Sequence, residues 1–277
     1  MAFKDILVTL TSYPEPTPVS VAEDAVAIAA ALGAHLAAVA CEVHVEIPGH
    51  FLSGGVVPGI VAGEAAKSRK NAQSLLAAFD AAADKAGVAH ETILEKAPTS
   101  AVQDLLVDYA RLRDLTIVSV PEGYDQWYAE AVIFGSGRPT LILPESPRSR
   151  PFELGTVVVA WDFSRAAARA VADALPLLEK AKKVRIVTVA NDKEFDTKHS
   201  AEELAKNLAR HGIDVVLDKV DAKDKAIGDV LEAYVAAQRA DVLVMGAYGH
   251  ARWREFILGG ATRNLLSKPP LPILFSH

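Results

Sequence analysis

The sequence predicts an α/β protein made of two tandem domains, each a doubly wound parallel sheet of the nucleotide-binding, Rossmann-like class. Short apolar runs alternate with longer amphipathic stretches along the chain, which is the pattern of strands joined by crossover helices. The pattern then starts again after a polar segment at residues 144–151 that carries three prolines and reads as a linker. Hydrophobic residues make up 51% of the 277 residues, enough for a well-buried core.

The first half contains five predicted strands and three predicted helices. The strands are expected at residues 6–10, 35–40, 90–94, 115–120 and 140–143. The helices are expected at residues 19–32, 64–86 and 101–111. Gly33 and Gly87 end the first two helices, because glycine tolerates the left-handed conformation that closes a helix. The glycine-rich stretch 49–63 is expected to be a mobile loop, since no Lys-Ser or Lys-Thr follows to complete a P-loop.

The second half repeats this order and suggests an internal duplication. Its strands are expected at residues 156–160, 184–189, 214–217, 241–245 and 270–275, and its helices at 164–178, 202–211 and from Thr262 onward. Residues 101–110 resemble residues 226–235, and each segment is followed by an aspartate and an apolar strand. We therefore expect two copies of one domain, at residues 1–146 and 152–277, rather than one large sheet. Their last strands are expected to pair edge to edge as an intrachain pseudo-dimer.

Composition excludes several classes of function. A net charge of −6 and a pI near 5.8 disfavour nucleic-acid binding. No apolar run reaches the ~18 residues of a membrane span, and no signal peptide is recognisable, so we expect a cytoplasmic protein. Cys41 is the only cysteine and cannot form an intrachain disulfide. Cys41 and His44 have a zinc-like spacing, but no second close pair follows, so no metal site is predicted.

Glycines dominate the segment that follows the predicted strand 241–245. They fall at Gly246, Gly249, Gly259 and Gly260, shortly before the predicted helix. Glycine at a strand exit lets a ligand approach the backbone, and a helix N-terminus presents free N–H groups to phosphate. The same glycines could also form only a tight turn and a helix cap.

The spacing of these glycines resembles the signature of the universal stress protein family. That signature is Gly-x-x-Gly, nine residues, then Gly followed by Ser or Thr, and Gly246, Gly249 and Gly259 match it. Asp162, just past the first strand of the second copy, and the Pro-Ile-Leu-Phe ending resemble further family features. The resemblance is strong for residues 155–277 and weak for 1–145. It implies an adenine nucleotide α-hydrolase-like fold with ATP, alone or together with Mg²⁺, at the carboxyl ends of the parallel strands.

The resemblance also implies a set of site residues. Ala160 and Asp162 would border the adenosine, Val189 would offer its backbone to the adenine edge, and Met245 and Gly246 would form the floor. The residues expected around the phosphates are Gly249, Gly259, Gly260, Ala261 and Thr262. Asp162 could instead be the N-cap of the following helix. Trp161 could stack on the base or block it.

Two differences from the family pattern limit the nucleotide hypothesis. Gly260 stands where the family has a hydroxyl residue, which would cost about 1.5–3 kcal/mol of phosphate binding unless Thr262 compensates. The first copy has neither a Gly-x-x-Gly after residues 115–120 nor a counterpart of Asp162, so it is expected to be a degenerate partner domain.

No catalytic pair or triad is recognisable, so the leading hypothesis is a universal stress protein that binds ATP in its C-terminal domain as a regulatory ligand in the stress response. The alternatives are a structural or partner-binding module with empty sites, or a slow ATPase. A homodimer and an unidentified protein partner are expected only by analogy with the family.

Overall fold

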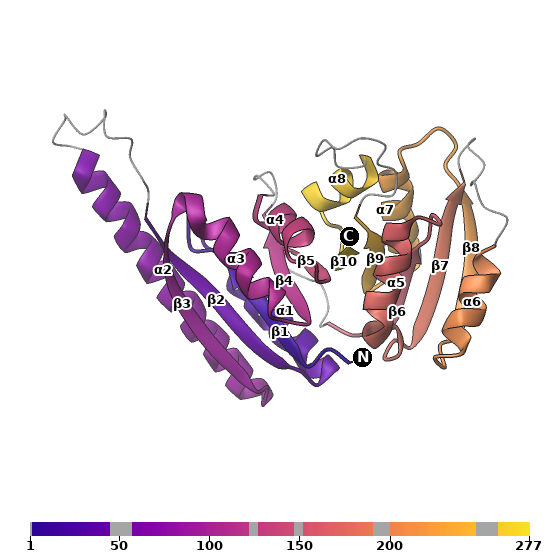
Figure 1. Ribbon diagram of the computed structural model, residues 1–277, viewed down its shortest axis with the longest axis horizontal. Coiled ribbons are helices and arrows are strands. Elements are labelled where there is room, and N and C mark those ends of the chain that lie inside the picture. The colour runs from indigo at the N-terminus through magenta and orange to yellow at the C-terminus, as the bar shows by residue number, and fades with distance from the viewer. Residues whose placement is uncertain (1, 45–56, 122–126, 147–151, 191–199, 248–259) are drawn as a thin grey trace.

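The protein forms one continuous, mostly parallel sheet with helices on both faces (Figure 1). The computed structural model describes residues 2–44, 57–121, 127–146, 152–190, 200–247 and 260–277. The first half consists of β1 (Asp5–Leu10), α1 (Val19–Leu32), β2 (His35–His44), α2 (Val57–Ala86), β3 (His90–Pro98), η2 (Thr99–Ala101), α3 (Val102–Arg111), β4 (Leu115–Val120), α4 (Trp127–Gly135) and β5 (Thr140–Pro144). The second half consists of β6 (Thr156–Ala160), α5 (Arg165–Leu178), β7 (Lys183–Ala190), α6 (Ala201–Ala209), β8 (Val215–Asp221), α7 (Ile227–Ala237), β9 (Val242–Gly246), α8 (Gly260–Ser267) and β10 (Ile273–Ser276).

The sheet is built from two halves with the same strand order. The order is β3-β2-β1-β4-β5 in the first half and β8-β7-β6-β9-β10 in the second, and all pairs within a half are parallel. The halves join through β5 and β10, which run antiparallel with Leu141 opposite Leu274. The predicted edge-to-edge pairing of the last strands is therefore confirmed, and it merges the two copies into a single ten-stranded sheet.

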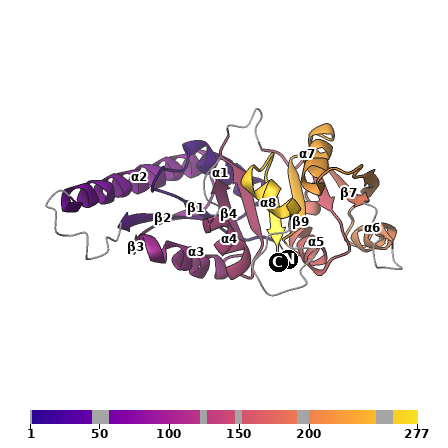
Figure 2. The ribbon, with the colours of Figure 1, turned by 90° about the horizontal axis from the view of Figure 1, so that it is seen from above.

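Two apolar cores lie on the two faces of this sheet. One packs under α1, α2, α5 and α6 and contains the fully buried Phe79 and Leu177. The other packs under α3, α4, α7 and α8 and contains Phe275. Figure 2 shows α2 and α3 on opposite sides of the first-half strands. Because both faces are covered, the central strands are apolar throughout rather than alternating.

Several helices differ from the sequence prediction, among them α2, α4 and α8. α2 begins at Val57, so residues 57–63 are helical rather than part of the expected mobile loop, while residues 45–56 lie outside the described part of the chain. α4 was not predicted, because its sequence is apolar on nearly all sides and has no 3.6-residue periodicity. α8 begins at Gly260, two residues before Thr262. No helix among the described residues is long and apolar enough to cross a membrane.

An aspartate fixes the start of the first strand in both halves. In the first half, Asp114 Oδ2 accepts hydrogen bonds from the backbone N–H groups of Lys4 (2.8 Å) and Asp5 (3.1 Å). In the second half, Asp241 Oδ2 accepts one from Thr156 N at 2.7 Å. Both aspartates precede the fourth strand of their half, where the internal repeat places them.

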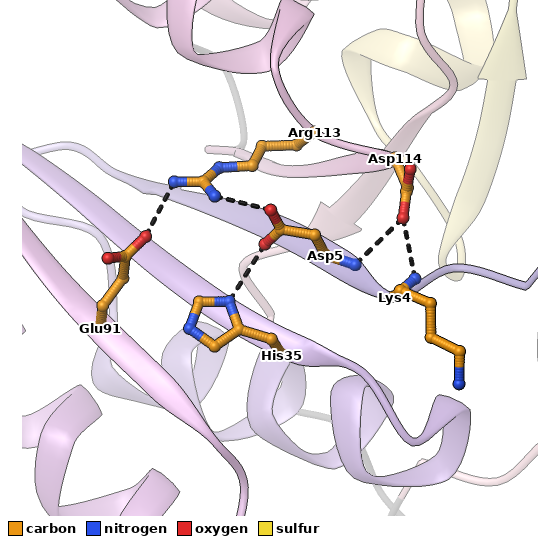
Figure 3. Close-up of polar contacts among 6 residues, drawn as sticks. All are labelled: Lys4, Asp5, His35, Glu91, Arg113 and Asp114. Atoms are coloured by element: carbon orange, nitrogen blue, oxygen red, sulfur yellow. Dashed lines mark hydrogen bonds and ion pairs between the residues drawn. The ribbon is translucent and has the colours of Figure 1, made fainter.

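The first half adds an ion-pair network at the same edge (Figure 3). Arg113 donates to Asp5 Oδ2 at 2.7 Å and to Glu91 Oε1 at 2.8 Å, while His35 Nδ1 lies 3.0 Å from Asp5 Oδ1. Burial raises the pKa of Asp5, but the hydrogen bonds from Arg113 and His35 outweigh it and hold that pKa below its ordinary value. The network ties β1, β2 and β3 to the segment before β4.

A tyrosine on the helix before the fourth strand is also duplicated. Tyr109 on α3 donates to the carboxylate of Glu95 on β3, and Tyr234 on α7 donates to Asp218 on β8 at 2.6 Å. Arg185 on β7 adds an ion pair to Asp218 at 2.8 Å. Together with the two aspartates, these contacts show that the internal repeat is structural as well as sequential.

Candidate functional site

The described residues of the predicted nucleotide site gather at one edge of the second half-sheet. β6 lies between β9 and β7, so the strand order reverses between β6 and β9. Ala160 ends β6, Met245 and Gly246 end β9, and Val189 lies next to the last residue of β7. These are the carboxyl ends of parallel strands at a topological switch point, which is where ligands bind in open α/β sheets.

The turn after β6 is short and internally hydrogen-bonded. Asp162 Oδ1 accepts from Ser164 N at 3.0 Å, and Ser164 Oγ accepts from Ala167 N at 3.0 Å. Ser164 is therefore the N-cap of α5, and the alternative that Asp162 caps this helix is wrong. Asp162 instead shapes the turn that leads into the cap. Phe163 completes the turn in a left-handed conformation with φ 62°.

Trp161 does not behave as an open stacking platform. Its ring is partly buried against the core under α5 and meets Phe163 edge to face, with 5.6 Å between the ring centroids. Ala160 and Val189 pack on the opposite core, next to Met245. The alternation of side chains along β6 thus separates Trp161 from the residues expected to contact the base.

Gly246 has a structural reason to be glycine. A Cβ built at this position would lie 2.5 Å from the backbone carbon of Ala166 and 2.5 Å from the nitrogen of Ala167. The first turn of α5 therefore rests directly on the end of β9. No contact among the described residues tests the prediction that Gly246 forms the floor of a ligand pocket.

α8 is the next described element after β9. Gly260 is exposed, and a Cβ built on it would meet no atom of the described residues within 4 Å. Thr262 is only 3% exposed, so its hydroxyl is not displayed at the surface as a replacement for the missing one at position 260. Ala261 is half-buried between these two residues. Gly249 and Gly259 lie outside the described residues.

The described part of the chain contains no cluster of three or more histidine, cysteine or acidic residues that could hold a metal ion. Cys41, considered as a zinc ligand with His44, is 5% exposed. Burial and, secondarily, the charge of Glu95 raise the pKa of the Cys41 thiol to about 11. Cys41 is therefore a protonated, buried side chain of β2.

The first half has a pocket that the sequence did not reveal. It lies at the corresponding switch point, between the ends of β1 and β4, and encloses a cavity of about 90 Å³. Its polar and aromatic lining comes from distant segments, which explains why no local motif marks it. Its lining includes Tyr13, Pro14, Glu15, Ser119, Tyr128 and Glu145.

Glu145 contributes a half-buried carboxyl group to this pocket. Burial raises its pKa above the ordinary value of 4.5, and a hydrogen bond from Ser119 Oγ to Glu145 Oε1, at 2.8 Å, opposes the rise. Burial also raises the pKa of Tyr128. A carboxyl group that is costly to ionise and lies in a cavity is a feature of binding sites.

Comparison with known proteins agrees with this architecture. Residues 153–277 match the universal stress protein family. A universal stress protein from Archaeoglobus fulgidus superposes with a TM-score of 0.67 at 15% identity, covering 98% of this chain and 97% of that one. A putative universal stress protein from Pseudomonas aeruginosa superposes with a TM-score of 0.59 at 15% identity, covering 99% and 93%.

A search of curated protein sequences found no match. At 15% identity the two structures establish the fold alone, whereas the family match rests on the sequence of the second half. The second half of the chain, residues 153–277, is therefore similar in sequence to the universal stress protein family, and the whole chain shares the tandem fold of the two solved structures.

Proposed function

We propose that the second half binds an adenine nucleotide, ATP in the first instance, as a regulatory ligand of a universal stress protein. The observation that carries the proposal is that the β6 turn and the end of β9 lie at the switch point of a parallel sheet, with α8 the next described element after β9. The first half serves as its structural partner.

The N-terminus of α8 supplies the phosphate-binding chemistry. Its first backbone N–H groups have no partners within the helix, and they carry the positive end of the helix dipole. Among the described residues no atom lies within 4 Å of a Cβ built on Gly260, which would leave the backbone there accessible to an anion. Gly249 and Gly259 are proposed to complete the cradle.

Asp162 supplies a contact for the ribose. Its Oδ1 is held by Ser164 N, and within the described part of the chain Oδ2 makes no hydrogen bond. A carboxylate whose orientation is already fixed by the turn loses little entropy when it accepts from ribose hydroxyl groups.

Regulation by occupancy fits the described side chains better than catalysis. No acid–base pair or nucleophile–base pair stands among the described residues proposed to contact ATP, and the one carboxylate among them, Asp162, is engaged in a turn. The ligand would therefore stabilise one conformation of the protein, which a partner could recognise.

Calorimetry with ATP and Mg²⁺ on the full-length protein tests the proposal, with ADP and AMP measured in parallel. Asp162→Asn keeps the size of the side chain while removing its charge and should weaken binding about tenfold. Gly246→Val is unsuitable because it would disrupt the contact with α5.

A matched control uses the other half of the molecule. Asp114→Asn changes an aspartate far from the proposed contacts and should leave ATP affinity unchanged. Absence of heat with folded protein at about 1 mM ATP would refute nucleotide binding and favour a partner-binding module. Phosphate release that Asp162→Asn abolishes would instead favour a slow ATPase.

A further inference from the structure

We propose that the pocket between β1 and β4 in the first half binds a small organic cation: a primary or quaternary ammonium group on a compact apolar body. This site is separate from the proposed nucleotide site. The inference rests on three features of the pocket: a wall that is already folded, an excess of negative charge, and aromatic rings beside it.

The wall formed by the turn after β1 is held by its own hydrogen bonds. Thr11 N donates to Thr17 Oγ1 at 2.9 Å, and Thr17 N donates to Thr11 O at 2.8 Å. Asn71 on α2 donates to Ser12 O at 3.1 Å, and Ser68, also on α2, lies 2.8 Å from Ser12 through their hydroxyl oxygens. A pocket with a wall braced in this way pays little ordering entropy when it is filled.

The charge of the pocket is negative. Glu15 and Glu145 both line it, and no lysine or arginine is among its lining residues. Lys67 reaches only the exposed Glu15, at 3.9 Å, and Glu145 makes no ion pair in the described part of the chain. A phosphate group here would meet like charge with no cation among the described lining residues to neutralise it, so an anionic ligand is disfavoured.

Glu145 is placed to pair with a cation. Ser119 fixes its Oε1, which leaves Oε2 for a further partner. Pairing with a cation would also offset the cost of burying the carboxylate.

Aromatic and apolar surface determines the class of cation. Tyr13 and Tyr128 line the pocket, and prolines, Val120 and Ala129 supply most of the remaining surface. Tyrosine faces attract ammonium groups, most strongly where water is excluded, and aromatic cages of this kind select alkylammonium ions over hydrated metal ions. The cavity of about 90 Å³ accommodates such a head group with a small body.

The test uses benzylammonium and tetramethylammonium chloride with the full-length protein, followed by calorimetry and ligand-observed NMR. Benzyl alcohol is the neutral analogue, and sodium chloride controls for ionic strength. We expect binding of both cations and at least about tenfold weaker binding of benzyl alcohol.

Glu145→Gln keeps the shape and the acceptor for Ser119 but removes the charge, and it should weaken both cations at least about tenfold. Glu15→Gln is the matched control at the exposed rim, with an expected change below about threefold. Tyr128→Leu should weaken the binding of tetramethylammonium. Circular dichroism should show that this variant is still folded.

Three outcomes would overturn the proposal: no binding of either cation at about 10 mM, equal binding of benzyl alcohol, or unchanged affinity in folded Glu145→Gln. ATP that competes with benzylammonium would show that the pocket accepts an adenine nucleotide instead. Because none of these readouts depends on α8 or Asp162, failure here leaves the proposed nucleotide site untouched.

Discussion

The two halves differ most in the turn that follows their first strand. Four residues, 161–164, join β6 to α5, whereas eight residues, 11–18, join β1 to α1. The short turn brings α5 down onto β9, while α1 packs mainly against α2 and β1. One topology therefore gives a strand end on which α5 packs directly in one half and a pocket at the strand ends in the other. The turn after the first strand is correspondingly shorter in the second half than in the first.

The two halves also differ in the residue near the end of their fourth strand. Gly246 and Ser119 stand five residues after Asp241 and Asp114 and occupy equivalent positions. In the second half only glycine fits under α5. In the first half Ser119 has room for a side chain and uses it to hold Glu145.

The largest expected effect on stability comes from breaking the close contact between Gly246 and α5. Gly246→Val should destabilise the protein by about 3 kcal/mol or more, because its Cβ would collide with backbone atoms that cannot move without shifting α5. Urea denaturation followed by circular dichroism measures the change. Ser119→Val, the equivalent substitution, should cost only about 1 kcal/mol through the lost hydrogen bond. Equal costs would mean that the two strand ends are packed alike.

The second comparison concerns the duplicated aspartates. Asp241→Ala should cost about 2–3 kcal/mol, since Asp241 is 2% exposed and its loss leaves the N–H of Thr156 without an acceptor. Asp114→Ala should cost about 1–2 kcal/mol, because Asp114 is half-buried and water can replace part of its role. Denaturation midpoints would measure both, and a larger loss in Asp114→Ala would contradict this ranking.

The sequence predicted much of the fold because its strands are continuous apolar runs bounded by glycine, proline or aspartate. It missed α4, whose helical faces are not distinguished by polarity, and the first turns of α2, where cooperative helix growth outweighs the cost of Gly59 and Gly63. The glycine motif predicted a ligand site only at the carboxyl ends of the second-half strands. The first-half pocket escaped notice because residues 13, 119, 128 and 145 meet only after β1 and β4 pair.

A third prediction concerns the missing hydroxyl group at the start of α8. Gly260→Ser should fit without strain, because no atom of the residues that the structure describes lies within 4 Å of the new Cβ. One added hydrogen bond to a charged phosphate oxygen should strengthen ATP binding about tenfold, equivalent to about 1.4 kcal/mol. Calorimetry compares the variant with Gly260→Ala, which adds the same carbon without the hydroxyl. Equal affinities in the two variants would show that no phosphate reaches this position.

The smallest expected effect is a pH dependence specific to the first half. Because folding raises the pKa of Glu145 above 4.5, the folded state binds this proton more tightly than the unfolded state does. That stabilisation is fully present below the ordinary glutamate pKa and is lost as pH rises through the raised value. Glu145→Gln should therefore gain in melting temperature relative to the wild type as pH increases from about 4 to 7. Ser119→Ala removes the hydrogen bond that lowers this pKa. In that variant the stabilisation should therefore be lost at a higher pH than in the wild type. A difference in melting temperature between wild type and Glu145→Gln that stays constant across this range would mean that water in the pocket lets Glu145 ionise freely. The contrast between the strand ends of the two halves would then be one of shape alone.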